Sequence, residues 1–318
     1  MGSRRLKSWL LHPSTELPEI ERRLGCVAEL VDKSEPRAQL RNFLAEVADL
    51  ERIINRMATR SATPRDLSAL RAALYAHGPL EDWLGAGVAA EAVVGISRDL
   101  AEIAPELSAL KALLAGALAD EPPAKLSDGG LIRPGHDAGL DELRRLRTDS
   151  GAVLKELEER ERRESGIGSL KVGYNSVFGY YLEVSKAHSE KAPARYTRKQ
   201  TLTNAERYIT PELKELEVTL LGAEDKFLKR ERELFEALRE AVLAQDAPVR
   251  RFAGLAAELD ALQSLAEAAA QGGWVKPVVD LGHELDIVEG RHPIVEAALP
   301  AGSFVPNSLR LDGLEAQT

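Results

Sequence analysis

The sequence has one cysteine, few aromatic residues and no long apolar run. Cys26 is the only cysteine among 318 residues, so no disulfide can form within the chain, and a reducing cytoplasm fits this usage. No apolar stretch approaches the roughly 18 residues of a membrane span, so we expect no membrane segment. Arg4, Arg5 and Lys7 interrupt the N-terminus where a signal peptide needs an apolar core. The sequence therefore predicts a cytoplasmic protein.

Charged and helix-forming residues are abundant instead. Charged residues make up 29% of the chain and aromatic residues 5%, which is typical of proteins built from long helices. Residues 3–120 repeat their apolar positions at helical spacing, and residues 88–118 predict one or two helices broken around Pro105. The net charge of −9 argues against nucleic-acid binding over the whole surface. Any such binding must be local.

Two long helices are predicted on either side of a different kind of segment. The first covers about 138–164 and the second starts at Pro211 and continues to about 245. The second helix repeats an apolar residue every seven positions, at Leu213, Leu220, Phe227, Leu234 and Ala241. The end of the first helix, residues 156–164, is almost wholly charged, so we expect it to project into solvent. Together the two helices predict an antiparallel arm.

The segment between these helices is rich in strands and basic. Residues 166–210 hold five of the six tyrosines, and apolar residues alternate there with the period of a strand. A hairpin turn is expected at Asn175-Ser176. This segment carries a net charge of +4, whereas the rest of the chain carries −13. A basic strand-rich segment in an acidic helical protein is the sharpest signal in the sequence.

The composition changes again after Gly272-Gly273. Residues 274–279, 285–288 and 304–305 look like short strands separated by glycine and proline. Three short strands without a crossover helix cannot form a closed α/β core. We therefore expect this segment to be the beginning of a domain rather than a complete one.

Four motifs together resemble the MutS family of DNA mismatch repair proteins. Two match the family's clamp, one its lead-in to the lever helices and one its lead-in to the ATPase domain. They are, in that order, Leu170-Lys-Val-Gly-Tyr-Asn-Ser-Val-Phe-Gly-Tyr-Tyr-Leu-Glu-Val-Ser185, Arg198-Lys-Gln-Thr-Leu-Thr-Asn-Ala-Glu-Arg-Tyr-Ile-Thr-Pro-Glu-Leu-Lys214, Gly130-Leu-Ile-Arg-Pro-Gly-His-Asp137 and Glu289-Gly-Arg-His-Pro-Ile-Val-Glu296. The resemblance covers essentially the whole chain.

The resemblance implies a mainly α fold with four parts. These are a helical core (1–137), two long antiparallel lever helices (138–165 and 209–270), a small β-rich clamp at their tip (166–208) and a partial, strand-containing N-terminal edge of an ATPase domain (271–318). In the family the clamp holds the DNA backbone and the levers connect that grip to the ATPase. The resemblance implies the same role for this chain.

Two motifs of the complete family are missing from the sequence. The family reads mismatches with a Phe-x-Glu motif, and no phenylalanine here is followed two positions later by glutamate. Its ATPase needs a phosphate loop ending in Gly-Lys-Ser/Thr, and the sequence has no Gly-Lys pair. We therefore expect no catalytic residue, no cofactor, no metal site and no enzymatic activity in this chain. The resemblance implies that the full-length protein is a DNA-dependent ATPase that uses ATP and Mg²⁺, with a homodimer partner and MutL.

The candidate DNA-binding residues are the cations and one amide in the connecting segments of the clamp. They are Lys186, Arg195, Arg198, Lys199 and Asn204. Flexible cations and amide donors suffice for a phosphate backbone, without sequence preference, whereas the plainer interpretation is a solvated basic loop. Tyr174, Tyr180 and Tyr181 are expected to pack the small β core rather than to stack on bases. The resemblance also implies a weak, partial adenine pocket at Phe304 and Val305.

Two functions remain open from the sequence. The first is non-specific binding of duplex DNA by the clamp, with the levers as mechanical coupling to the ATPase. The alternative is a helical scaffold whose arm tip binds a protein partner. A salt-dependent interaction with DNA distinguishes the first from the second.

Overall fold

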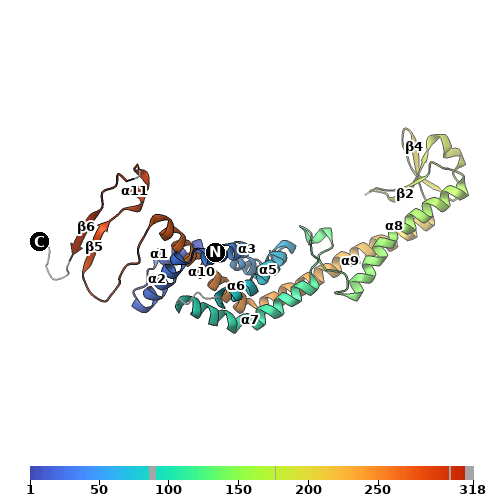
Figure 1. Cartoon of the computed structure of the whole chain (residues 1–318). Helices are drawn as coiled ribbons and strands as arrows, with labels where there is room; N and C mark the ends of the chain where they lie inside the picture. Colours follow the sequence, from blue (N-terminus) through green and yellow to red (C-terminus); the bar gives the residue numbers. More distant parts are fainter. Residues whose placement is uncertain (86–90, 176, 301, 312–318) are drawn as a thin grey trace. The chain divides into compact units, whose positions relative to one another are not determined.

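The chain is mainly helical, as the composition predicts, with two small antiparallel sheets. The structure is a computed structural model that describes residues 1–85, 91–175, 177–300 and 302–311. Figure 1 draws the chain in sequence colours. Its internal contacts divide it into two compact units. The first comprises Met1–Ala58, Ala69–Lys111 and Gln245–Thr318, and the second comprises Thr59–Ser68 and Ala112–Ala244.

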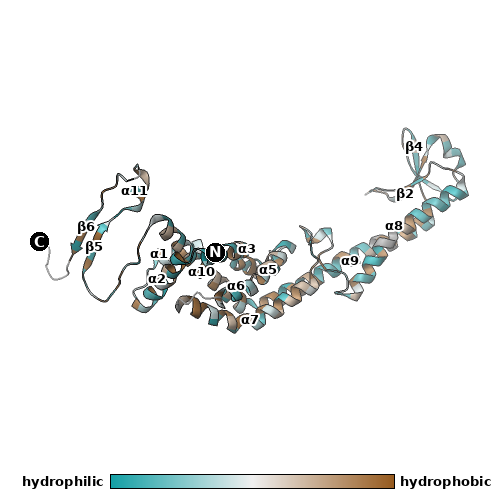
Figure 2. Cartoon of the chain, in the orientation of Figure 1, coloured by the Kyte–Doolittle hydropathy of each residue, from teal (hydrophilic) through white to brown (hydrophobic). Residues whose placement is uncertain are grey.

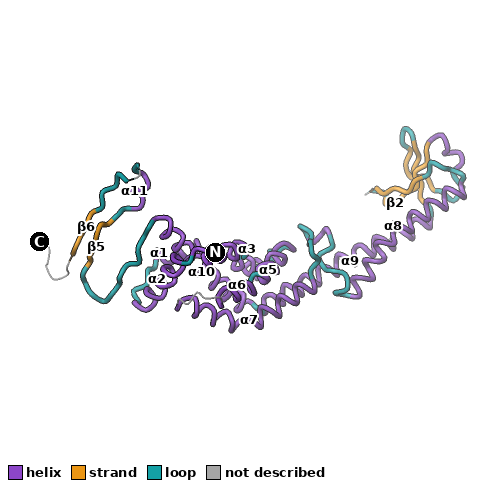
Figure 3. The backbone as a smooth tube through the Cα atoms, viewed as in Figure 1, coloured by secondary structure: helices purple, strands orange, loops and turns teal. Residues whose placement is uncertain are grey.

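Helices supply the core of the first unit, as the tube in Figure 3 shows. They are α1 (Gly2–Leu11), α2 (Leu17–Asp32), α3 (Ser34–Glu46), α4 (Leu50–Ala58), α6 (His77–Gly85) and α10 (Asp246–Gly272), while α5 (Pro64–Tyr75) and α7 (Glu91–Ala117) have residues in both units. The helix α10 packs against α1, α2, α3 and α4. Phe252, Leu259 and Leu262 of α10 are fully buried, as expected for a helix with apolar residues around most of its circumference.

The predicted break at Pro105 is wrong. The helix α7 continues through Pro105, with Ile103, Leu107 and Leu110 buried on either side of it. A proline inside a helix removes one backbone hydrogen bond and costs about 3 kcal/mol. Burial of the apolar residues that flank Pro105 offsets this cost. Residues 88–90, the beginning of the predicted segment, lie outside the described residues.

The connection between α7 and α8 (Ala138–Ser165) is fixed to α9 (Pro211–Ala244) by a buried carboxylate. Glu231 of α9 is fully buried, and its two oxygens accept hydrogen bonds from Gly130 N at 2.8 Å and Ile132 N at 3.3 Å. Ile132 forms an antiparallel bridge with Leu118 at the end of α7. The short 3₁₀ turn η1 (Leu126–Asp128) lies within this connection. Glu231 therefore positions the chain just before the first long helix begins.

The start of α8 is capped and tied to α9. Asp137 accepts a hydrogen bond from Leu140 N at 2.8 Å, as an N-cap residue does. Arg230 of α9 donates to the same carboxylate at 2.7 Å. These two hydrogen bonds, the one from Arg230 foremost, lower the pKa of Asp137. The predicted motif that ends at Asp137 thus has a structural role at the base of α8.

The two long helices pack against each other along the apolar positions of α9. Leu213 and Phe227 of the predicted seven-residue repeat are buried, and Leu220, Leu234 and Ala241 are half-buried. On the facing helix, Leu140 and Leu157 are buried. Outside this seam, the end of α8 that lies beside the strands is hydrophilic, as Figure 2 shows. The helix α7 is largely apolar by comparison. The helix α8 ends at Gly166, whose φ of 65° is a left-handed cap conformation that favours glycine.

Four antiparallel strands form the sheet that follows α8. They are β1 (Lys171–Asn175), β2 (Gly179–Ser185), β3 (Thr197–Thr201) and β4 (Ala205–Ile209), in the order β1-β2-β4-β3. One face packs on the ends of α8 and α9, where Leu157 and Leu213 meet Leu182, Val184 and Tyr208 in one buried cluster. The strand alternation in the sequence therefore predicts this inner face correctly.

The turn between β1 and β2 requires a glycine, Gly179, next to the carboxylate of Glu217. Asn175 pairs with Gly179, and Val177 N donates to Asn175 Oδ1 at 2.8 Å. Gly179 has a φ of 78°, and a β-carbon there would lie 2.3 Å from an oxygen of Glu217 in α9. Only glycine fits this position. A turn is present where the sequence predicts one, although Ser176 itself lies outside the described residues.

The C-terminal segment contains a two-stranded sheet rather than the three predicted strands. The strand β5 (Leu285–Gly290) includes the predicted 285–288, and it pairs with β6 (Asn307–Leu311). A short helix, α11 (Pro293–Ala298), lies between them in the sequence. Residues 274–279 form no strand, and the strand expected at 304–305 begins instead at Asn307. Valine-rich segments adopt strand geometry only where a partner strand is available, and residues 274–279 have none among the described residues.

Candidate nucleic-acid interface

Lys186 and Asn204 adjoin one end of the four-stranded sheet, and Arg198 and Lys199 lie in β3 beside the other end of β4. Lys186 begins η2 (Lys186–Lys191), directly after β2, and Asn204 precedes β4. Lys186 N donates to Asn204 O at 3.0 Å, so these two residues are neighbours. Arg198 and Lys199 lie in β3, at an irregularity in its pairing with β4. The side chains of all four are exposed.

These cations differ in how far the protein neutralises them. Lys186 and Lys199 have no hydrogen bond or ion pair from their ammonium groups within the described part of the chain. Arg198 donates to Glu206 at 3.3 Å, and its side chain is 61% exposed. A pair of this length on an exposed side chain is weak. All three remain accessible to an external anion.

Glu206 is a buried carboxylate next to this group. The hydroxyl of Tyr208 donates to it, and this hydrogen bond, with the positive charge of Arg198, lowers the pKa of Glu206. Burial, together with the same hydrogen bond, raises the pKa of Tyr208 to about 12. Glu206 therefore stays ionised, and its negative charge partly offsets the positive charges of Arg198 and Lys186 on its side of the sheet.

Arg195 is placed differently from the other predicted residues. It lies between η2 and β3, and its Nη2 donates to Glu161 and to Glu164 of α8 at 2.6 Å in each case. The hydroxyl of Tyr196 donates to the same oxygen of Glu161 at 2.7 Å. Arg195 thus connects the sheet to the last turns of α8, a role that its position in a basic loop does not reveal.

The prediction that the charged end of α8 projects into solvent is wrong on one face. Leu157 is 4% exposed and Glu161 is 2% exposed. The sheet covers this face, with Tyr196 and Arg195 as partners for the buried carboxylate. Sequence reasoning missed Glu161 because it is one of five glutamates among residues 156–164, and nothing local distinguishes it.

The opposite face of the sheet carries a compact polar group. The guanidinium of Arg207 stacks over the ring of Tyr181 with a centroid distance of 4.2 Å, and it donates to Glu183 at 3.0 Å. Glu206 and Arg207 are adjacent in β4, but their side chains do not form an ion pair with each other, because consecutive strand residues point to opposite faces of the sheet. Tyr180 packs against the buried cluster as predicted, whereas Tyr181 is buried on the opposite face beneath Arg207. Tyr174 is 53% exposed and contacts Tyr180 with a ring distance of 5.0 Å.

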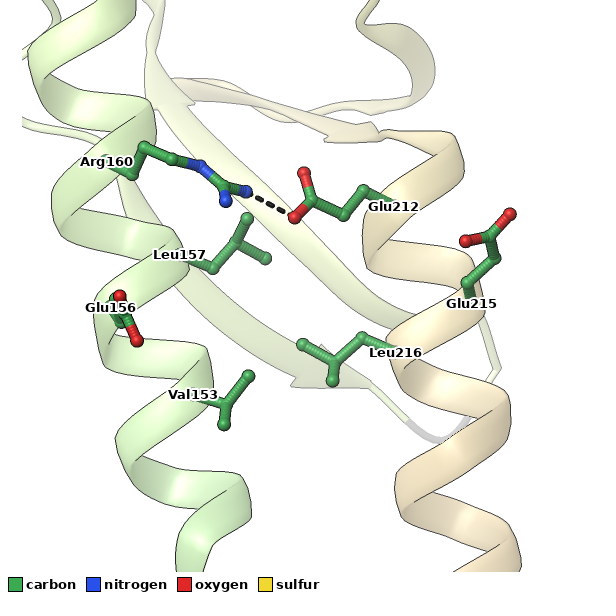
Figure 4. A pocket seen from close by; sticks show the side chains of 7 residues that line it. All are labelled: Val153, Glu156, Leu157, Arg160, Glu212, Glu215 and Leu216. Atoms are coloured by element: carbon green, nitrogen blue, oxygen red, sulfur yellow. Dashed lines mark hydrogen bonds and ion pairs between the residues drawn. The ribbon is translucent and has the colours of Figure 1, made fainter.

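A groove of about 370 Å³ lies between α8 and α9 near the sheet, and Figure 4 shows its lining. Arg160 of α8 donates to Glu212 of α9 across the groove. Its lining residues are Val153, Glu156, Leu157, Arg160, Glu212, Glu215 and Leu216. Three of the seven are acidic and the only cation is paired, so this groove repels phosphate.

Phe304 and Val305 lie in the segment that leads into β6. Val305 is 75% exposed and Phe304 is half-buried. The adenine pocket implied by the resemblance stays a prediction. Within the described ranges, no group of three or more His, Cys, Asp or Glu side chains is arranged to hold a metal ion. No helix in those ranges is both long and apolar enough to cross a membrane.

Comparison with known proteins gives one consistent family. Residues 1–266 match the family model described as MutS domain III. The DNA mismatch repair protein MutS of Symbiobacterium thermophilum is 45% identical over 316 residues, which cover 98% of this chain and 35% of that protein. The MutS proteins of Anaeromyxobacter dehalogenans and Salinibacter ruber are 46% and 43% identical, over 97% and 98% of the chain and 35% and 34% of their own lengths. The chain thus spans about a third of the length of the curated relatives it matches.

Proposed function

The chain belongs to the MutS family of DNA mismatch repair proteins, and from this membership we propose that its four-stranded sheet grips the backbone of duplex DNA. The helices α8 and α9 then act as levers that transmit this grip to an ATPase domain of the full-length protein. The observation that carries the proposal is the set of exposed cations on the sheet, with Lys186 beside Asn204 at one end and Arg198 and Lys199 in β3.

The chemistry of this group suits phosphate rather than base edges. Lys186 and Lys199 offer mobile point charges, and Arg198 offers a planar guanidinium held only by a weak pair. Asn204 adds an amide donor. Such groups neutralise phosphates and release counterions, which gives affinity without sequence information. We propose that the grip is therefore independent of sequence and of mismatches.

Replacing Arg198 and Lys199 together by alanine is expected to weaken duplex binding about tenfold or more at low salt. Each lost phosphate contact reduces the slope of log K against log salt by about 0.9, so the slope should become shallower by up to ~2. The loss should be equal for every duplex sequence. Fluorescence anisotropy titrations at several salt concentrations measure both quantities.

A matched control separates this effect from the change in net charge. Lys229 and Arg232 are exposed on α9, outside the sheet, and replacing both by alanine removes the same two charges. This control should change affinity far less than the variant in β3. Equal losses in the two double variants would contradict a DNA site at the sheet and leave only a general electrostatic attraction.

We also propose that this chain does not itself hydrolyse ATP. The sequence has no Gly-Lys pair, so the lysine that stabilises the transferred phosphate in phosphate-loop enzymes has no counterpart. ATP and Mg²⁺ would bind to the full-length protein, which we propose also pairs with a second copy and with MutL. Release of phosphate from ATP above background by a purified sample, with or without duplex DNA, would contradict the proposal that this chain does not hydrolyse ATP.

One observation favours the second candidate, a protein-binding arm tip. The turn between β1 and β2 exposes apolar side chains, with Val177 at 76% and Phe178 at 41%. Exposed apolar residues in a cluster mark many protein contacts. A Val177→Ser substitution tests this candidate. If the variant loses a protein contact but still binds duplex DNA, the turn between β1 and β2 binds protein and the cations of the sheet bind DNA.

A further inference from the structure

The carboxylates that hold Arg195 differ in burial, although each accepts a hydrogen bond of 2.6 Å. The side chain of Glu161 is 3% exposed, whereas that of Glu164 is 48% exposed, similar to Arg195 at 45%. Both bonds come from the same nitrogen, Nη2 of Arg195. The arginine is therefore shared between a fixed acceptor and a solvated one.

We infer that Glu164 competes with a DNA phosphate for Arg195 and so lowers the resting affinity of the sheet for duplex DNA. This inference rests on the proposed function. Arg195 keeps its bond to Glu161 in both states. In the DNA-bound state a phosphate oxygen replaces Glu164 as the second acceptor of the guanidinium.

Glu161 cannot take part in such an exchange. It is buried, and it also accepts the hydroxyl hydrogen bond of Tyr196, which is 7% exposed. Removing one partner of a buried ion pair leaves an uncompensated charge in the interior, which is strongly destabilising. The bond between Arg195 and Glu161 is therefore retained as the joint between the sheet and α8.

Glu164 can leave at little cost. It lies in the last turn of α8, exposed to water, where an ion pair contributes little to stability. The guanidinium of Arg160 lies near enough to interact with its charge, but the hydrogen bond of Arg160 goes to Glu212 instead. A backbone phosphate offers two charged oxygens, as the carboxylate of Glu164 does, and it suits the planar donor fork of arginine. Release of Glu164 thus adds one phosphate contact to the group at β3 and η2.

The Glu164→Gln variant tests this exchange directly. We expect duplex DNA to bind about fivefold more tightly at low salt, because an exposed competing pair is removed. The slope of log K against log salt should stay unchanged, because Arg195 contacts a phosphate in the DNA-bound state of both proteins. Thermal unfolding should be unchanged, whereas Glu161→Gln should lower the unfolding temperature.

Glu159→Gln is the matched control. Glu159 is exposed on the same helix, and it forms no ion pair within the described residues. Both variants change the net charge by the same amount, so only Glu164→Gln should bind duplex DNA about fivefold more tightly. Equal affinities of the two variants, or a steeper slope for Glu164→Gln than for the unsubstituted chain, would overturn the inference. If the unsubstituted chain shows no salt-dependent binding of duplex DNA, the proposed function itself fails, and the inference fails with it.

Discussion

Replacing Phe227 by alanine is expected to lower the free energy of unfolding of the second unit by about 3–5 kcal/mol. Phe227 is 1% exposed at the seam between the two long helices, and the guanidinium of Arg147 lies 5.0 Å from the centre of its ring. Truncation removes the largest buried side chain of this seam and leaves a cavity.

Hydrogen exchange under increasing urea measures this loss in each unit separately. Ala119 N, bonded to Leu131 O at 2.9 Å, should lose protection in the variant, whereas amides of α10 in the first unit should keep theirs. Phe227→Leu, which preserves most of the volume, should cost under about 1.5 kcal/mol. Unchanged protection in Phe227→Ala would mean that the seam does not stabilise the second unit.

Replacing Glu231 by alanine is expected to cost about 2–3 kcal/mol, because the buried amide of Ile132 and the part-buried amide of Gly130 lose their acceptor at once. Gly130 N and Ile132 N have this carboxylate as their partner, and Glu231 itself is fully buried. The connection between α7 and α8 should then detach from α9. Chemical denaturation and exchange at residues 130–132 report the two effects.

Glu233→Ala provides the comparison on the same helix. Glu233 is 48% exposed, and its pair with Arg230 lies at the surface, so its loss should change stability by less than about 0.5 kcal/mol. A similar small effect for Glu231→Ala would show that the buried carboxylate is not the anchor of this connection.

The periodic features of the sequence predict the elements of the fold. The seven-residue repeat indicates α9, the alternation of apolar residues indicates β1 and β2, and the connector before residue 138 places the start of α8. Periodicity reports which face a single element buries, so it succeeds where the buried face is apolar. The clamp motifs similarly identify the segment that carries Lys186, Arg198 and Lys199.

Buried carboxylates are what the sequence could not predict. Glu161, Glu217 and Glu231 resemble the solvated glutamates around them, and each is buried by a tertiary partner that is 34 or more residues away. The role of Arg195 follows from Glu161 and is hidden for the same reason. Pro105 shows the converse, since a strong local signal for a helix end is outweighed by apolar packing on both sides.

The most direct test of a phosphate grip at the sheet is the salt dependence of duplex binding by the unsubstituted chain. Three to five phosphate contacts predict a slope of log K against log salt of roughly −3 to −4.5. Matched and mismatched duplexes should give the same affinity and the same slope. A slope near zero, or a clear preference for the mismatched duplex, would contradict the account.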